Sequence, residues 1–247
     1  MEIRRYQNKW GHNFRIIGFD NFIECVQFLV DNPNLYFNTS AHGFAEMHFN
    51  KRLSQQLSSI DAPFLIDGIW SLAFFRPLNK SIIQIPGWDL IAALLPKLNE
   101  KCSSVHVIWS SEDIIFALKE MYPLIRWSYY SGIVEQSADL SSIKNVNSFC
   151  TLVALGSPKQ DTVALRLSQE LKDNQLIIPV GIALAMHVGV EKKVPAIYTR
   201  LGLSWLHRFI QKPLKMTKRI VQIIRFLIMS KTLFNVVPSL RINKNAK

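Results

Sequence analysis

Cysteine is scarce in this chain, and the few cysteines form no recognisable motif. Of 247 residues only Cys25, Cys102 and Cys150 are cysteines, and they are far apart, without CxxC or Cys/His metal spacing. This argues against a disulfide framework and favours a reducing compartment. The chain also lacks an apolar run of 18 or more residues and an apolar signal core near its start, so we expect neither a spanning helix nor a signal peptide.

Several familiar catalytic motifs are missing as well. The six histidines form neither HExxH nor an i, i+4 pair, so no metal site is expected. GxSxG, Walker A and GxGxxG do not occur, which argues against lipase-like, kinase-like and simple dinucleotide-binding proteins.

Acidic residues are absent behind Glu191, although 13 of the 29 lysines and arginines lie there. The net charge of +11 therefore belongs to the C-terminal end, while the rest of the chain is close to neutral. A uniformly basic surface would favour nucleic-acid binding. A one-ended distribution instead favours an appendage that docks on phosphates or on an anionic membrane.

The body of the chain alternates short apolar segments with longer helical patterns. This alternation predicts βαβ units, hence an α/β fold with a Rossmann-like, mostly parallel sheet covered by helices. The expected strands are 35–40, 63–68, 104–110, 125–134, 149–156 and 176–184, and the expected helices are 41–59, 88–101, 112–123 and 161–173. Ligands of such sheets bind where the strands end and the turns to the helices begin.

Beyond about residue 197 the pattern becomes that of a basic amphipathic helix. We therefore divide the chain into a core, 1–197, and a basic helical appendage, 198–247. On a helical wheel Lys215, Lys218, Arg219 and Arg225 share one arc opposite an apolar face. The pattern favours docking in a membrane interface, and the alternative is a helix packed on the domain with solvated charges.

The segment "LGSPKQ" ends an apolar run and begins a helical pattern. Ser157 is a suitable N-cap, Pro158 suits the first helical position, and Gln160 completes a capping box. Gly156 permits close approach and Lys159 adds charge, so a diphosphate would fit this helix start. The alternative is an ordinary, well-capped helix.

Two aspartates follow apolar segments. Asp67, in "FLIDGIW", is expected at a strand end, where partial desolvation would raise its pKa and suit it to act as a general base. The alternative is a turn aspartate beside Gly68. Asp89, in "IPGWDL", is expected at a helix start, by default as a cap.

Six stretches in order resemble the WecG/TagA/CpsF family of glycosyltransferases, which act in bacterial surface-polysaccharide and teichoic-acid assembly. They are "NTSAHGF", "FLIDGIW", "IPGWDL", "ALGSPKQD", "PVGIALAMHVGVEKKVP" and "LGLSWLHRFIQKP". The resemblance implies inverting, metal-independent transfer, without a cofactor, from a nucleotide sugar, usually a UDP-sugar, to a sugar on undecaprenyl diphosphate. It also implies a peripheral protein on the cytoplasmic face of the inner membrane, whose basic appendage docks there and helps to close the active site.

The resemblance also assigns residues. Asp67 corresponds to the family's proposed catalytic base and Thr39 lies in its substrate-pocket segment. The loop with Gln160 matches the family's "GxPKQE" type, and Arg200 and Arg208 match positions that clamp phosphates. We count Asp89, Gly156, Ser157 and Lys159 with the same predicted substrate site.

The chain departs from the family at several positions. Ala41, Gln84, Ala185 and Ser204 replace residues that are often asparagine, arginine, aspartate and glutamate, and Asp161 replaces the usual glutamate. Losing an arginine and carboxylates removes charge-assisted hydrogen bonds, which are the strong ones, so a divergent donor or acceptor is expected. Two other hypotheses stay open: a non-catalytic, membrane-associated partner in polysaccharide assembly, and a nucleic-acid-binding module.

Overall fold

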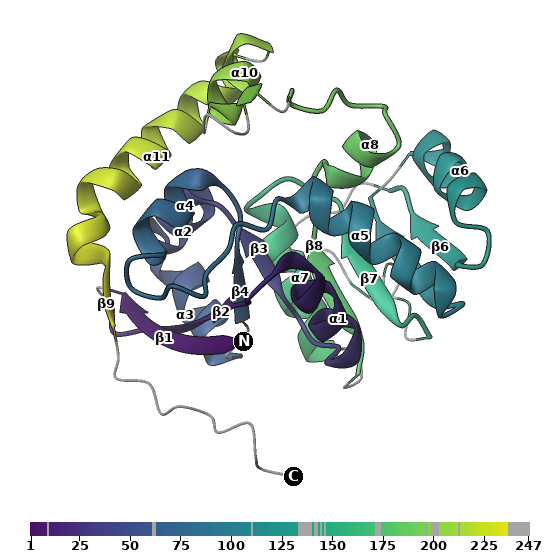
Figure 1. Cartoon of the computed structure of the whole chain (residues 1–247), viewed down its shortest axis with the longest axis horizontal. Coiled ribbons are helices and arrows are strands. Elements are labelled where there is room, and N and C mark those ends of the chain that lie inside the picture. Colours follow the sequence, from purple (N-terminus) through teal and green to yellow (C-terminus); the bar gives the residue numbers. More distant parts are fainter. Residues whose placement is uncertain are drawn as a thin grey trace.

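The computed structural model describes most of the chain. The described residues are 1–8, 10–60, 63–109, 111–132, 140, 143, 145, 147–170, 174–195, 197–198, 203–211 and 213–236, with the backbone alone at 215 and 229–236. Figure 1 shows two sheets side by side, with helices on their faces. The predicted α/β class is confirmed, but the strands form two sheets instead of one.

Sheet B is wholly parallel and has the strand order β6-β5-β7-β8. Its strands are β5 (Ser104–Ile108), β6 (Arg126–Tyr130), β7 (Cys150–Val153) and β8 (Leu176–Pro179). The two strands β7 and β8 are buried on both faces, which explains why they are continuous apolar runs.

Sheet A is mixed and has the order β3-β4-β2-β1-β9. Its strands are β1 (Glu2–Asn8), β2 (Asn13–Gly18), β3 (Phe37–Thr39), β4 (Pro63–Ile66) and β9 (Phe234–Val236). The strands β2, β4 and β3 run parallel, whereas β1 pairs antiparallel with both β2 and β9. The β1–β2 hairpin, which the sequence pattern did not reveal, completes this second sheet.

Within the described residues, an isolated β-bridge joins the two sheets. Leu35 pairs in parallel with Ile177, and the backbone N–H of Tyr36 donates to the carbonyl of Ile177 at 3.0 Å. The carboxyl ends of β3 and β4 are thereby held beside those of β7 and β8. A polar cavity lies at this junction between the sheets.

The helices of the core lie over the faces of the sheets (Figure 1). They are α1 (Phe22–Asp31), α2 (Ala41–Phe49), α3 (Lys51–Ser59), α4 (Ile69–Phe75), α5 (Gly87–Glu100), α6 (Glu112–Met121), α7 (Lys159–Glu170) and α8 (Ala183–His187). The expected helix 41–59 is wrong as one element, because Asn50 ends α2 through its N–H and caps α3 through its side chain. Such local side-chain bonds compete with helix continuation.

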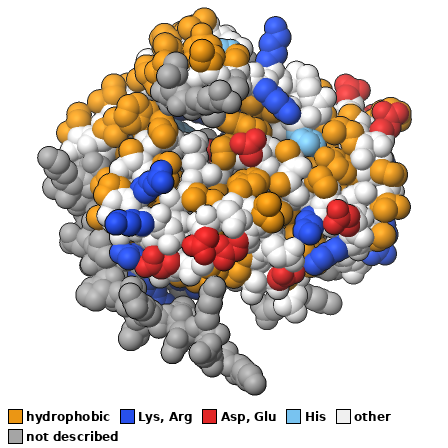
Figure 2. All heavy atoms as spheres, in the orientation of Figure 1, with side chains coloured by type: hydrophobic (Ala, Val, Ile, Leu, Met, Phe, Trp, Pro, Cys, Tyr) orange, Lys and Arg blue, Asp and Glu red, His pale blue; other side chains and the backbone are white. Residues whose placement is uncertain are grey.

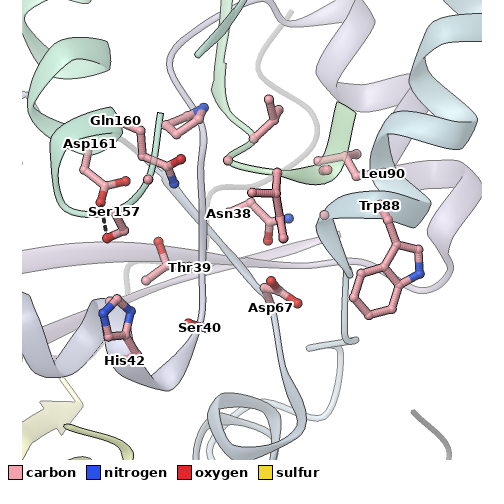
Figure 3. A pocket seen from close by; sticks show the side chains of 18 of the residues that line it. Asn38, Thr39, Ser40, His42, Asp67, Trp88, Leu90, Ser157, Gln160 and Asp161 are labelled. Carbon is pink, nitrogen blue, oxygen red and sulfur yellow. Dashed lines mark hydrogen bonds between the residues drawn. The ribbon is translucent and has the colours of Figure 1, made fainter. Parts of the chain in front are cut away.

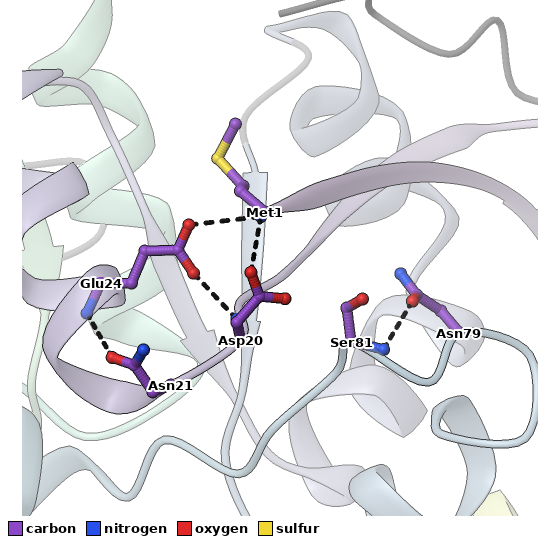
Figure 4. Close-up of polar contacts among 6 residues, drawn as sticks. All are labelled: Met1, Asp20, Asn21, Glu24, Asn79 and Ser81. Carbon is purple, nitrogen blue, oxygen red and sulfur yellow. Dashed lines mark hydrogen bonds and ion pairs between the residues drawn. The ribbon is translucent and has the colours of Figure 1, made fainter.

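The start of α1 shows how a polar turn fixes the entry of a helix (Figure 4). Asn21 Oδ1 accepts from the N–H of Glu24 at 2.8 Å, and Glu24 Oε2 accepts from the N–H of Asp20 at 2.9 Å. The Met1 ammonium lies 3.2 Å from Glu24 Oε1. Together these contacts fasten the residue that precedes β1 to the first turn of α1.

The C-terminal segment forms α10 (Ser204–Gln211) and α11 (Pro213–Leu233), which arch over α2 and α4 (Figure 1). Phe226 is fully buried in the core, and Met216 is almost fully buried. The segment then returns as β9 to the edge of sheet A, so it is not helical throughout.

Candidate active site

A polar cavity, cavity 1, lies at the junction of the two sheets, at the carboxyl ends of four strands. Its polar walls include Asn38 and Thr39 from β3, Asp67 after β4, Ser157 after β7 and Gly181 after β8. Figure 3 shows the side chains of Asn38, Thr39, Asp67 and Ser157 converging from separate elements. The cavity therefore occupies the position at which α/β sheets bind ligands.

Asp67 stands at the end of β4, as predicted. Its backbone N–H donates to the carbonyl of Thr39 at 3.0 Å, and the following Gly68 has a φ of 85°, which suits glycine. Burial raises the pKa of Asp67 to about 6, although Arg208 and a backbone hydrogen bond from Gly68 lower it; nearby Asp89 raises it further. The carboxylate is thus mostly ionised at pH 7 and basic enough to accept a proton.

The predicted capping box at the start of α7 is wrong. The N–H of Gln160 donates to the carbonyl of Gly156 at 3.2 Å, and the Ser157 hydroxyl donates to Asp161 Oδ2 at 2.7 Å (Figure 3). Ser157 is therefore a donor to a carboxylate and not the acceptor that caps the helix. The box fails because Asp161, one position beyond Gln160, offers the hydroxyl a charged partner.

This arrangement alters what the start of α7 is suited to bind. Burial raises the pKa of Asp161 to about 6, against hydrogen bonds from Ser157 and Gln160 that lower it, while Glu46 raises it. A carboxylate that is mostly ionised at pH 7 repels a diphosphate, and Lys159 is exposed and does not line cavity 1. The hydroxyl and carboxylate instead suit the hydroxyl groups of a ribose or a sugar.

Two arginines supply positive charge from the other side. Arg208 on α10 and Arg219 on α11 both line cavity 1, and the Arg208 guanidinium lies 6.0 Å from the centre of the Trp88 ring. Burial lowers the pKa of Arg219, and the neighbouring Arg208 lowers it further. Two cations held close together in a half-buried site favour an anionic ligand.

Arg219 had been expected on a membrane-facing arc with Lys218 and Arg225. The structure corrects this placement, because α11 packs on the core through Met216 and Phe226, and Arg219 lies on the same side. Lys218 and Arg225 are exposed, and Arg225 lies 5.4 Å from the centre of the Phe49 ring. Arg200 lies outside the described residues, as does the side chain of Lys215.

A second cavity, cavity 2, adjoins the first and lies under α10 and α11. The two cavities share six residues, namely Ser40, His42, Asp67, Trp88, Arg208 and Arg219. Cavity 2 alone is lined by Ala41, Gly68, Ile69, Trp70, Gln84, Ser204, Trp205, Met216 and Ile223. Its walls are thus more apolar than those of cavity 1, and Asp67 stands at the boundary.

The remaining predicted residues fall into place around these cavities. Thr39, Gly156, Ser157 and Gln160 line cavity 1. Asp89 is exposed in the first turn of α5, two positions inside the helix, where it faces a separate shallow depression and lines neither cavity. It suits the helix dipole but is not the N-cap, which is Pro86.

The departures from the family pattern are unevenly distributed. Ala41, Gln84 and Ser204 line cavity 2 and not cavity 1, Asp161 lines cavity 1, and Ala185, on α8, lines neither. Cavity 2 is therefore the part of the site in which this chain differs most from the pattern that it resembles.

Sequence reasoning missed two polar residues of the site, His42 and Asn38. Burial lowers the pKa of His42 to about 4, and Arg219 lowers it further, so His42 is neutral at the boundary of the cavities. Asn38 Oδ1 and Gln160 Oε1, on the wall of cavity 1, are buried without a hydrogen-bond partner among the described residues. Unsatisfied buried groups often mark ligand contacts, and the position of "NTSAH" after a strand was the available signal.

Fold and site together define an α/β protein with a polar cavity at its strand ends, which is lined by an ionisable carboxylate and two arginines. The chain matches the glycosyl transferase WecG/TagA/CpsF family over residues 8–236 and belongs to that family. Within the described part of the chain, no group of three or more histidine, cysteine, aspartate or glutamate side chains is arranged to hold a metal ion. No described helix is long and apolar enough to cross a membrane.

Proposed function

We propose that this glycosyltransferase moves a sugar from a UDP-sugar to a sugar on undecaprenyl diphosphate, with inversion and without a metal ion. The observation that carries the proposal is the position of Asp67, at a strand end where it lines two cavities together with two arginines. One cavity has the polar walls that a nucleotide sugar needs, and the other offers room for an acceptor.

In the proposed step Asp67 removes the proton from an acceptor hydroxyl. The acceptor oxygen forms a bond to the anomeric carbon while the bond from that carbon to the diphosphate oxygen breaks, and UDP leaves with the electron pair. The proton ends on Asp67. A single displacement of this kind inverts the anomeric centre, and a base with a pKa of about 6 is suited to neutral pH.

The leaving diphosphate gains negative charge, and Arg208 and Arg219 are the groups suited to stabilise it. They line the cavity on the side of α10 and α11, whereas Asp161 makes the start of α7 less suitable for phosphate. Fixed cations aimed at developing charge are among the largest contributions to catalysis. In this proposal they take the part that a metal ion takes in other transferases.

The proposal includes docking on the cytoplasmic face of the bacterial inner membrane through α10 and α11. The outer side of these helices carries exposed apolar residues. They are Ile210, Leu214, Val221, Ile224, Leu227 and Ile228. Figure 2 shows hydrophobic side chains gathered over this part of the molecule. The exposed Lys218 and Arg225 stand beside them, which is the combination that binds anionic interfaces.

The direct test is a panel of UDP-sugars incubated with a short-chain lipid diphosphate that carries GlcNAc, with the product identified by mass. We expect one donor to give a product one sugar heavier, in EDTA as well as in Mg²⁺. Asp67→Asn is expected to lower turnover by about a thousandfold or more while UDP binding, measured by calorimetry, changes little. Asp113→Asn, an exposed change on α6, is the matched control and should retain full turnover.

In Asp67→Asn, the loss of the general base can be distinguished from a loss of folding stability. Because burial raises the pKa of Asp67 from 3.8 to about 6, ionising this group destabilises the folded state progressively as the pH rises through that range. The penalty is present at neutral pH, so Asp67→Asn should not lower the free energy of unfolding. Full turnover in this variant would refute the base, and vesicle binding without nucleotide-sugar binding in the wild type would favour the non-catalytic partner.

A further inference from the structure

Cavity 2 has walls of a different chemistry from those of cavity 1. Its own residues include two tryptophans, Trp70 on α4 and Trp205 on α10, and the shared Trp88 adds a third indole. Met216 and Ile223 from α11 complete an apolar wall. A cavity with broad aromatic faces and a few polar groups is typical of a site that holds an organic ligand in a fixed orientation.

Tryptophan is suited to one face of a sugar ring. The C–H groups on a pyranose face form an apolar surface, which packs on an indole, while the hydroxyl groups at the ring edge need polar partners. Trp205 Nε1 is buried without a hydrogen-bond partner among the described residues. An unmade hydrogen bond of this kind is costly, and a ligand oxygen that reaches the indole N–H would recover it.

The geometry of an inverting displacement indicates which cavity holds the donor and which holds the acceptor. In an inverting transfer the acceptor oxygen approaches the anomeric carbon from the face opposite the leaving diphosphate. Asp67 has to reach that acceptor oxygen, and it is shared by the two cavities. If the nucleotide sugar occupies the polar cavity 1, the acceptor enters from cavity 2.

The arginines of cavity 2 and the apolar surface of α11 next to it indicate which kind of acceptor fits. Arg208 and Arg219 line cavity 2 as well as cavity 1, so an acceptor anion would find a cation at the same boundary. The helix that contributes Met216 and Ile223 also carries the exposed Leu214 and Val221 on its outer side. A ligand with a sugar, a diphosphate and an apolar chain matches this succession of surfaces.

We propose that cavity 2 is the acceptor subsite, in which Trp70 and Trp205 hold the sugar of a lipid-linked diphosphate. This inference rests on the proposed function and adds a location and a recognition chemistry to it. It makes Trp70 a binding residue for the acceptor alone, and Asn38, which lines only cavity 1, a binding residue for the donor alone.

The test compares two variants against two ligands. The affinities of the wild type, Trp70→Phe, Trp70→Ala and Asn38→Ala are measured by calorimetry for UDP and for a short-chain prenyl diphosphate that carries GlcNAc. We expect Trp70→Ala to weaken acceptor binding by about tenfold or more and Trp70→Phe by less, with UDP binding unchanged. Asn38→Ala is expected to do the reverse, and thermal melting checks that each variant is folded.

The outcomes separate the subsite from the function. A wild type that binds both ligands, while both Trp70 variants keep wild-type acceptor affinity, would overturn the subsite and leave the proposed function standing. Weakened UDP binding in Trp70→Ala with unchanged acceptor binding would exchange the two cavities and would also overturn it. A wild type that binds neither ligand would refute the proposed function and the subsite together.

Discussion

The two cavities share Asp67, but their walls are built from different kinds of structure. Cavity 1 is formed by the ends of β3, β4, β7 and β8, whose positions are fixed by parallel ladders of backbone hydrogen bonds. The outer wall of cavity 2 is formed by α10 and α11, which are held on the core through side chains such as Phe226 and through the short strand β9. We call the first the rigid wall, because backbone hydrogen bonds between strands hold it, and the second the attached wall, because side-chain packing on α2 and the short strand β9 hold it.

This difference suggests a division of labour. The general base has to keep its position to within a fraction of an ångström, and it stands on the rigid wall. The arginines that balance charge stand on the attached wall, next to the surface proposed to meet the membrane. The division predicts that changes on the attached wall affect charge stabilisation and membrane binding separately, according to the face of α11 that they alter.

The largest effect expected on the attached wall comes from Arg219. Arg219→Ala removes a cation from the boundary of the cavities, so turnover should fall by about a hundredfold, the usual cost of losing one transition-state donor. Turnover is measured with the short-chain acceptor in solution, without vesicles. Lys218→Ala, its exposed neighbour, is the matched control and should keep wild-type turnover under these conditions.

The order of the effects of Lys218→Ala and Arg219→Ala should reverse when vesicle binding is measured in place of turnover. Lys218→Ala is expected to weaken binding to anionic vesicles, whereas Arg219→Ala should leave vesicle binding nearly unchanged. Full turnover with poor vesicle binding in Arg219→Ala would show that Arg219 faces the membrane. The proposed difference between the two faces of α11 would then be wrong.

A smaller effect is expected from pH. Since Asp67 must be ionised to accept a proton and its pKa is raised to about 6, kcat/KM should be level above pH 7 and fall about tenfold for each pH unit below 6. Asp161 has a pKa raised to about the same value, so the wild-type profile alone does not identify the group. The acid limb should persist in Asp161→Asn, and its disappearance there would assign it to Asp161.

The same division explains which parts of the site could be predicted from the sequence. Strand ends are placed by topology, because parallel strands bring their carboxyl ends to one edge wherever they lie in the chain. Asp67, Thr39 and Ser157 were therefore predicted to meet, and they do line one cavity. The separation into two sheets was not predictable, since it depends on the β1–β2 hairpin and on a bridge between Leu35 and Ile177.

Residues on the attached wall were harder to place. A helical wheel separates charged from apolar faces, but it does not say which face packs on the core, and α11 turns Arg219 inward together with Phe226. The capping box failed for a related reason. Its residues were all present, yet the Asp161 carboxylate competes for the Ser157 hydroxyl, and only the folded geometry decides between the two partners.

The smallest effect expected is on the outer face of α11, and it tests whether that face binds a membrane. Val221→Ser and Ile228→Ser each remove an exposed apolar side chain and should weaken binding to anionic vesicles by about fivefold, since each would lose roughly 1 kcal/mol of burial in the interface. Turnover with the soluble acceptor should not change, because neither residue lines a cavity. Phe116→Ser on α6, which is also an exposed apolar residue, is the control. Equal vesicle binding by all three variants and the wild type would show that the apolar side chains of α11 do not enter the lipid, and the attachment would then rest on charge alone.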